Sequence, residues 1–329
     1  MPFDPTDKLV WVAGQHGMVG GAVMRRLRRE ACQLLLDPGR AVVDFRQQSD
    51  VEEWMAEHRP QVVFLSAARV AGISANDAFP ADFLYDNLLI EANIIHAAYR
   101  TGVEKLLFFG SSCIYPREAP QPIPEDALLT GPLEPTNEAY AVAKIAGLRL
   151  CQAYRRQHGC DFISVMPTNL YGPGDNFHAE NSHVPAALLR RFHEAKLAGV
   201  SEVVVWGSGT PRREFLYVDD LADASLHLLR HYSSDSHINI GAGYDVTIAE
   251  FAEKIRRCVG FEGRIVYDRS RADGMPRKLL DSSRIHALGW SPATSLEEGL
   301  RLYYDWFLAN QSKLRETVFK GTAASKMTA

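Results

Sequence analysis

The chain places a tyrosine and a lysine four residues apart, in the stretch Tyr140-Ala-Val-Ala-Lys144. In a helix, residues four apart lie on the same face, one turn from each other. An isolated tyrosine has a pKa of about 10 and transfers protons poorly near neutrality, whereas a cation beside it favours the phenolate. The pair is therefore a candidate for proton transfer by Tyr140 with help from Lys144. The same spacing also occurs in ordinary amphipathic helices, so it needs support from the rest of the chain.

Support comes from upstream, where Ser111 and Cys113 directly follow the apolar run 106–109. That run has the composition of a buried parallel strand, and the active groups of open α/β sheets lie at the carboxyl ends of such strands. Ser111 is therefore a candidate hydrogen-bond donor to a substrate oxygen. Cys113 taken alone fits better as a small core residue, because free cysteines are commonly buried.

A glycine-rich turn stands near the N-terminus, between the apolar run 9–13 and an amphipathic stretch that contains Ala22, Val23 and Leu27. Strand, glycine turn and helix in this order are typical of a dinucleotide-binding site. The glycines let the backbone approach the pyrophosphate, and the helix N-terminus offers free N–H groups. The turn predicts a cofactor-binding set made of Gly14, Gln15, His16, Gly17, Met18, Val19 and Gly20.

The next apolar segment, 33–36, reads as a second strand whose end should lie near the adenosine ribose of the cofactor. Asp37 and Arg40 follow it, and they favour different cofactors. An acidic side chain suits a free 2′-hydroxyl, whereas an arginine suits a 2′-phosphate. The residues themselves leave this choice open.

Apolar runs and amphipathic stretches continue to alternate along the chain as far as the apolar run at 162–166. This alternation predicts an α/β fold with a Rossmann-type doubly wound parallel sheet. Beyond Pro167 the pattern loosens and indicates a smaller α/β substrate-binding lobe. We therefore predict a dinucleotide-binding domain mainly at 8–170, a substrate lobe mainly at 171–312 with segments returning to the first domain, and a disordered tail at 313–329.

The bulk composition narrows the class of protein. With 329 residues and 46% hydrophobic content, the chain can bury one large core or two unequal ones. A net charge of −4 gives no reason to expect nucleic acid or an anionic membrane as partner. No apolar run approaches the roughly 20 residues of a membrane span, and residues 1–8 lack the pattern of a secretory signal. The 5 cysteines are scattered, and no residue spacing indicates a metal site, so we expect a reduced, cytoplasmic protein.

Together, Gly14-x-x-Gly17-x-x-Gly20, the serine at a strand end and Tyr140-x-x-x-Lys144 resemble the extended short-chain dehydrogenase/reductase superfamily. Longer motifs narrow the resemblance to the GDP-L-fucose synthase family, and they extend over most of the chain, from about residue 8 to 310. They are Gly17-Met-Val-Gly20, Gly110-Ser-Ser-Cys-Ile-Tyr-Pro116, Leu133-Glu-Pro-Thr-Asn-Glu-Ala-Tyr140, Met166-Pro-Thr-Asn-Leu-Tyr-Gly-Pro173, Asp175-Asn-Phe-His178, Asn181-Ser-His-Val184 and Val205-Trp-Gly-Ser-Gly-Thr-Pro211.

The resemblance implies a Rossmann fold, NADP(H) as cofactor, a homodimer, and conversion of the GDP-sugar GDP-4-keto-6-deoxy-D-mannose to GDP-L-fucose. By motif position, Ser111, Tyr140 and Lys144 would carry out reduction at C4, and Cys113 and His183 would be the acid/base pair for epimerisation at C3 and C5. The remaining implied cofactor contacts are Arg40, Lys144, His183 and the segment Pro167, Thr168, Asn169 and Leu170. The implied substrate contacts are Arg191, Trp206 and Arg213. Asp273 lies with Lys278 in a loop that contains glycine and proline, and we predict that this loop closes over the sugar nucleotide with Asp273 as a further substrate contact.

One position departs from the family pattern. Family members commonly carry an arginine that helps to hold the 2′-phosphate where this chain has His16, whereas Arg40 keeps a matching position. NADP(H) is therefore favoured, and the strictness of its preference over NAD(H) stays open.

The residue types suit this chemistry. A 4-keto group acidifies the protons on C3 and C5, and a thiol and an imidazole can both titrate within reach of neutrality. Hydroxyls of Ser111 and Tyr140 would stabilise the enolate oxygen at C4 and then serve reduction at the same carbon. Two rivals remain: a sugar-nucleotide 4-epimerase of the same superfamily that retains NAD(H), and a dinucleotide-sensing protein without turnover.

Overall fold

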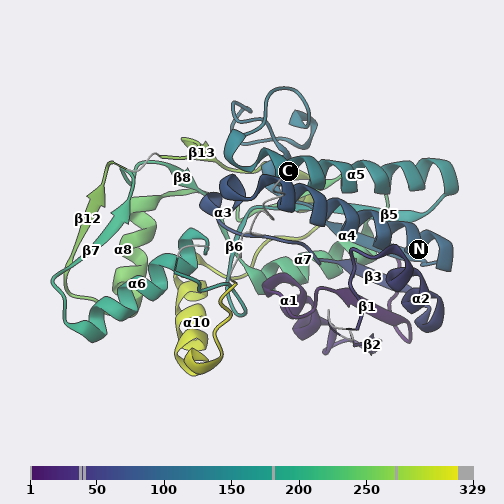
Figure 1. Ribbon diagram of the computed structural model, residues 1–329, viewed down its shortest axis with the longest axis horizontal. Helices are drawn as coiled ribbons and strands as arrows, with labels where there is room; N and C mark the ends of the chain where they lie inside the picture. Colours follow the sequence, from purple (N-terminus) through teal and green to yellow (C-terminus); the bar gives the residue numbers. More distant parts are fainter. Residues whose placement is uncertain (1, 37–38, 40–41, 180–181, 271–272, 318–329) are drawn as a thin grey trace, which may run out of the picture.

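The computed structural model describes residues 2–36, 39, 42–179, 182–270 and 273–317. Its largest element is a 6-stranded sheet in the order β10-β5-β4-β3-β1-β2, in which every neighbouring pair is parallel (Figure 1). The strands are β1 (Leu9–Ala13), β2 (Gln33–Leu35), β3 (Val62–Leu65), β4 (Lys105–Phe109), β5 (Asp161–Pro167) and β10 (Ile238–Ile240). Since β2 and β3 lie on opposite sides of β1, a topological switch point lies at the carboxyl end of β1.

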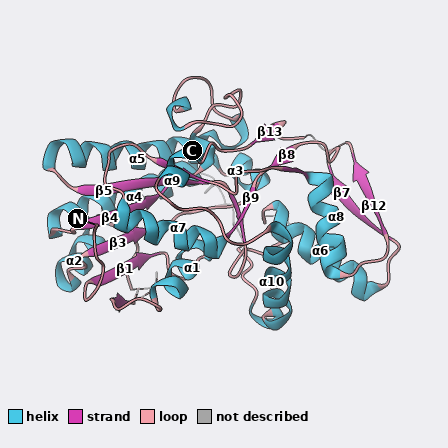
Figure 2. Cartoon of the chain, turned by 180° about the vertical axis from the view of Figure 1, so that it is seen from behind, coloured by secondary structure: helices cyan, strands magenta, loops and turns pink. Residues whose placement is uncertain are grey.

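Helices cover both faces of this sheet because side chains along each strand alternate between two cores. Trp11, Phe108 and their neighbours pack on one face against α2 (Gln48–His58), α4 (Pro80–Thr101) and α5 (Glu138–His158). Val10, Phe64 and their neighbours pack on the other face against α1 (Met18–Leu27), α7 (Val218–His231) and α9 (Ser283–Ala287). Figure 2 shows the helices flanking the sheet. The predicted doubly wound Rossmann-type fold is confirmed.

The smaller lobe lies beside the carboxyl edge of the sheet, on the left in Figure 1. Its core contains stacked rings of Phe215 and Phe251, whose centroids are 3.9 Å apart. Three helices build this lobe, namely α6 (Val184–Ala198), α8 (Ile248–Val259) and α10 (Leu296–Ala309). Three short sheets complete the described lobe: β6 (Asn169–Tyr171) with β9 (Phe215–Tyr217), β7 (Glu202–Trp206) with β12 (Arg264–Asp268), and β8 (Arg212–Arg213) with β11 (Val246–Thr247) and β13 (Arg277–Lys278).

The chain crosses between the two lobes more than once. After building part of the smaller lobe it returns to the large sheet with α7 and β10, enters the smaller lobe again, and returns with α9. Two short elements, α3 (Ile73–Ala78) and the 3₁₀ helix Ser112–Ile114, follow β3 and β4 at the carboxyl edge. This edge therefore faces segments from both halves of the sequence.

The last described residues pack against the smaller lobe. The backbone N–H of Phe177 donates to the carbonyl of Arg315 at 2.8 Å, and that of Thr317 donates to Asn176 Oδ1 at 2.9 Å. Residues 318–329 of the predicted tail lie outside the described residues. Among the helices that the structure describes, none is long and apolar enough to cross a membrane. The described His, Cys, Asp and Glu side chains form no group of three or more that could hold a metal ion.

Candidate active site

The loop after β1 presents backbone to the switch point. Gly14 has a φ of +90°, and a Cβ there would lie 2.7 Å from the backbone nitrogen of Ala67. Helix α1 begins at Met18, and no side chain caps its first N–H groups. A bare backbone and free N–H groups at a helix N-terminus fit the pyrophosphate of a dinucleotide. The glycine loop therefore has the shape that the predicted cofactor set requires.

Gly20→Ala is expected to weaken dinucleotide binding at least about tenfold and to lower the melting temperature. A Cβ on Gly20 would lie 2.1 Å from the carbonyl oxygen of Gly14, so the start of α1 would have to move away from the loop. Fluorescence titration with NADPH and a melting curve measure both effects. Gly21→Ala is the matched control, because its Cβ would meet no atom closer than 3.6 Å. Equal losses in the two variants would contradict the close-packing argument.

Ser111 and Tyr140 meet at the carboxyl end of β4. Ser111 caps the following 3₁₀ helix by accepting from the Cys113 N–H at 3.2 Å, and its hydroxyl is hydrogen-bonded to the Tyr140 hydroxyl. Tyr140 is almost fully buried, and burial, together with the charges of Cys113 and Glu91, raises its pKa. The expectation that a neighbouring cation lowers this pKa is wrong for this environment. A tyrosine that keeps its proton is suited to act as an acid.

Lys144 is held by groups other than the Tyr140 hydroxyl. Its Nζ is 5.8 Å from the centre of the Tyr140 ring, donates to the Phe109 carbonyl at 3.0 Å and lies 2.9 Å from Glu91 Oε1. Both members of this ion pair are buried, with 2% and 1% of their side chains exposed. Burial raises the pKa of Glu91 to about 7, although the charge of Lys144 opposes this. Glu91 was not predicted as a site residue, and its signal in the sequence is an acidic residue within the apolar stretch of a long helix.

Cys113 lies beside the tyrosine with polar neighbours at its sulfur. Asn137 Nδ2 is 3.4 Å from Sγ, and Lys278 Nζ is 3.5 Å from it. The side chain is only partly buried, where it packs against the cluster that contains Tyr140. A purely structural core residue would not be faced by an ammonium group, so the geometry favours a chemical role for the thiol. Lys278 was predicted only as part of a loop over the sugar nucleotide, and Asn137 only as part of a family motif, so their contacts with the thiol were not predicted.

His183 precedes α6 and belongs to the same neighbourhood. The residue is exposed to solvent, yet the protein atoms around the imidazole desolvate it and so lower its pKa. A hydrogen bond to the backbone of Ala71 opposes the decrease, while the charges of Arg315 and Lys278 add to it. Since Ala71 also contacts the Tyr140 cluster, the imidazole, thiol, phenol and serine hydroxyl converge from distant parts of the sequence.

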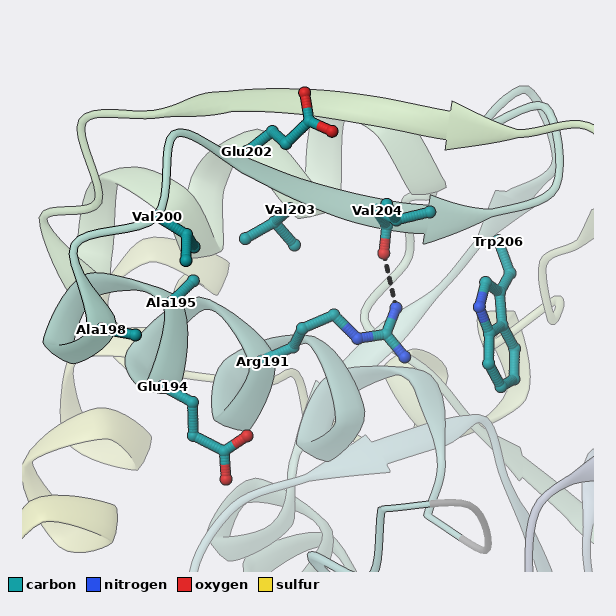
Figure 3. A pocket seen from close by; sticks show the side chains of 9 residues that line it. All are labelled: Arg191, Glu194, Ala195, Ala198, Val200, Glu202, Val203, Val204 and Trp206. Atoms are coloured by element: carbon teal, nitrogen blue, oxygen red, sulfur yellow. Dashed lines mark hydrogen bonds between the residues drawn. The ribbon is translucent and has the colours of Figure 1, made fainter.

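Arg191 and Trp206 lie together in the smaller lobe (Figure 3). The guanidinium lies over the indole at 5.2 Å and donates to the Val204 carbonyl at 2.6 Å. The two side chains line an open hollow of about 500 Å³ between α6 and β7, and half of the Trp206 surface is exposed. Ser111, Cys113 and Tyr140 do not line this hollow. It therefore offers a cation and an aromatic face apart from the catalytic side chains.

Arg213, on β8, is half-buried. Desolvation lowers its pKa, and the charges of Asp273 and Cys113 oppose that decrease, so it lies within electrostatic reach of both groups. Asp273 accepts from the Ser208 hydroxyl at 2.6 Å and from the Ser208 N–H at 2.9 Å, which lowers the pKa of the carboxyl. An arginine within reach of the thiol is suited to bind a phosphate of the sugar nucleotide.

The segment Pro167–Leu170 lies at the carboxyl end of β5, where the chain enters β6. Thr168 is buried, and its backbone N–H donates to the Ile240 carbonyl at 3.0 Å. Asn169 Nδ2 donates to the Glu214 carbonyl at 2.9 Å. These bonds fix the segment at the strand edge predicted for the nicotinamide. Arg40 and Asp37 lie outside the described residues, so the expected ribose contacts stay predictions.

Residues 10–241 match the family described as NAD dependent epimerase/dehydratase family. GDP-L-fucose synthase 1 of Arabidopsis thaliana is 58% identical over 301 residues, which cover 92% of this chain and 93% of that protein. The chain belongs to the GDP-L-fucose synthase branch of that family. The GDP-L-fucose synthase of Escherichia coli (strain K12) is 53% identical over 315 residues, covering 93% of this chain and 98% of the relative.

Solved structures agree with this placement. The crystal structure of a GDP-L-fucose synthetase from Naegleria fowleri bound to NADP superposes with a TM-score of 0.88 at 30% identity, covering 96% of this chain and 98% of that chain. A GDP-6-OMe-4-keto-L-xylo-heptose reductase from C. jejuni superposes with a TM-score of 0.89 at 35% identity, covering 94% and 99%. The resemblance recognised from the sequence motifs is confirmed.

Proposed function

We propose that this chain converts GDP-4-keto-6-deoxy-D-mannose to GDP-L-fucose by epimerisation at C3 and C5 followed by NADPH-dependent reduction at C4. The observation that carries the proposal is the convergence of Cys113 and His183 with the Ser111–Tyr140 pair. Reduction alone needs no second acid/base pair, whereas inversion of two carbons beside a ketone does.

Epimerisation begins with removal of the acidic proton beside the ketone. A neutral imidazole can accept that proton, and the desolvated His183 keeps the neutral form down to a lower pH than usual. Cys113 offers a proton donor, with the Lys278 ammonium close enough to compensate charge on its sulfur. Hydroxyls of Ser111 and Tyr140 donate to the oxygen at C4 while negative charge develops there.

Reduction uses the same oxygen. The nicotinamide, when bound, supplies a hydride to C4. Tyr140, which burial keeps protonated, donates its proton to the resulting alkoxide, and Ser111 keeps the oxygen in place. The glycine loop, Lys144 and the segment 167–170 would hold the cofactor. NADP(H) is inferred from the family resemblance and from the Naegleria fowleri relative solved with NADP.

The direct test supplies GDP-4-keto-6-deoxymannose with NADPH and, separately, with NADH, and follows the loss of reduced-nicotinamide absorbance. We expect stoichiometric oxidation of NADPH and formation of GDP-L-fucose. A purified protein that retains its dinucleotide and turns over without net oxidation would instead be a 4-epimerase. Binding of the dinucleotide without any turnover would identify a sensor.

Arg191→Met is expected to raise the KM for the GDP-sugar about tenfold to a hundredfold with little change in kcat, because a charged hydrogen bond to a phosphate contributes about 1.5–3 kcal/mol. Steady-state kinetics at saturating NADPH measure the change. Arg190→Met is the matched control, since Arg190 is paired with Glu194 and does not line the hollow. A kcat effect without a KM effect would place Arg191 elsewhere in the mechanism.

We also infer a homodimer, which rests on the family resemblance alone. Light scattering on the purified chain tests it, and a monomer at working concentration would contradict it.

A further inference from the structure

The Glu91–Lys144 pair joins the two long helices that cover one face of the sheet, α4 and α5. Glu91 is fully buried, and its two oxygens find no hydrogen bond of normal angle among the described residues, although Lys144 Nζ lies only 2.9 Å from Oε1. A Cβ on Gly147 would lie 2.4 Å from Oε2, so a glycine on α5 makes room for this carboxylate. Burying a charge that is balanced by a single cation costs free energy of desolvation, and a hydrophobic contact between the two helices would stabilise their packing more.

The titratable and charged groups around this pair come from several elements. On α5 they are Tyr140, Lys144 and Cys151, whose thiol is hydrogen-bonded to Ser164 on β5 and whose pKa burial raises. From the end of β4, Cys113 and the hydroxyl of Ser111 face Tyr140. Within this set of described groups, Lys144 is the cation that contacts Glu91. The carboxylate therefore acts on the candidate active site through the lysine and through its own charge.

We propose that Glu91 is a positioning residue for reduction: its carboxylate holds the Lys144 ammonium beneath Tyr140 and balances its charge, so that Tyr140 keeps its proton until C4 is reduced. This inference rests on the proposed function, because it assigns a role within the reductive half of that reaction.

The direction of the effect follows from the charges. The Glu91 charge raises the pKa of Tyr140. Without it, the ammonium of Lys144 is unopposed and favours the phenolate, so a smaller fraction of Tyr140 carries the proton that reduction consumes. This change moves the alkaline decline of the reduction rate toward lower pH.

Glu91→Gln keeps the side-chain shape and removes the charge. We expect the alkaline decline in the rate of NADPH oxidation to begin about one to three pH units lower than in the wild type, compared in single turnover from about pH 6 up to the highest pH at which both proteins stay folded. Exchange of the C3 and C5 protons in deuterated water should stay within about twofold of wild type, because Cys113 and His183 carry it. An unshifted pH profile would overturn the proposal.

The matched control is Asp161→Asn, which breaks a second lysine–carboxylate pair at the opposite edge of the same sheet. Lys105 Nζ lies 3.0 Å from Asp161 Oδ2, and Lys105 is as buried as Lys144. This variant should lose stability in a melting curve without moving the pH profile. If both variants lower stability and neither moves the profile, Glu91 is only structural and the proposal fails.

Glu91→Asp keeps the charge and is the variant to measure if Glu91→Gln does not fold. Shortening the side chain draws the carboxylate away from Nζ, so we expect kcat for reduction to fall several-fold while exchange persists; a wild-type kcat would overturn the positioning role. Failure of this inference is distinguishable from failure of the proposed function. In the first case the wild-type chain oxidises NADPH with the GDP-sugar, and in the second it does not.

Discussion

Replacing Tyr140 by phenylalanine is expected to lower NADPH oxidation by about 10²–10⁴-fold while exchange of the C3 and C5 protons of the substrate with solvent stays partly intact. The phenol is the acid for the alkoxide at C4, and burial keeps it protonated. Exchange depends instead on Cys113 and His183, and Ser111 remains to donate to the enolate oxygen. Single-turnover absorbance measures reduction, and proton NMR in deuterated water measures exchange.

The control for Tyr140→Phe is cofactor affinity, which should stay close to wild type because the Lys144 contacts to Glu91 and the Phe109 carbonyl do not involve the phenol hydroxyl. Complete loss of exchange together with reduction, at unchanged NADPH affinity, would show that Ser111 alone does not stabilise the enolate oxygen and that epimerisation depends on Tyr140 as strongly as reduction does. Normal reduction in the variant would remove Tyr140 from the proposed mechanism.

Cys113→Ser is expected to have the opposite effect, lowering exchange at C3 and C5 by about 10²–10⁴-fold while NADPH binding persists. A serine hydroxyl is a much weaker acid than a thiol, so the neighbouring Lys278 ammonium cannot make it a useful proton donor and acceptor near neutrality. The catalytic hydroxyls remain, so slow reduction of the unepimerised ketone would give a GDP-6-deoxyhexose that differs from GDP-L-fucose at C3 and C5. Product NMR distinguishes the two sugars.

Cys160→Ser is the matched control, because Cys160 is also partly buried but packs against the core of the large sheet. It should exchange protons at the wild-type rate. His183→Asn provides a second measurement at the same site and should also impair exchange. If Cys113→Ser loses NADPH binding as severely as exchange, the thiol is structural.

The sheet was predictable because its strands are buried on both faces. Residues in that position must be apolar along their whole length, and the helices between them must repeat at a helical period. The continuous burial of β1, β3 and β4 follows this rule. The course of the smaller lobe was less predictable, since β8, β11 and β13 are only 2 residues long and carry little pattern of their own.

The candidate site was likewise predictable only in part. Motifs identified Ser111, Cys113, Tyr140, Lys144 and His183 as candidates because chemistry restricts the residue types that can serve. The environment of those groups was not predictable, and the expected direction of the Tyr140 pKa was wrong because Glu91 and burial come from elements distant in sequence. Glu91 belongs to no motif, and the loop that contains Lys278 did not predict the contact of Lys278 with Cys113, so both residues matter through what they contact.

The sequence by itself determined that a glycine loop would follow a buried strand and that a parallel sheet would form. It also determined which side chains could transfer protons. These properties depend on residue types and on neighbours along the chain. Only the tertiary structure decided which of those side chains meet and with what charge state. A thiol beside Lys278, a phenol kept protonated and a lysine balanced by Glu91 all depend on desolvation and on charges supplied by distant segments.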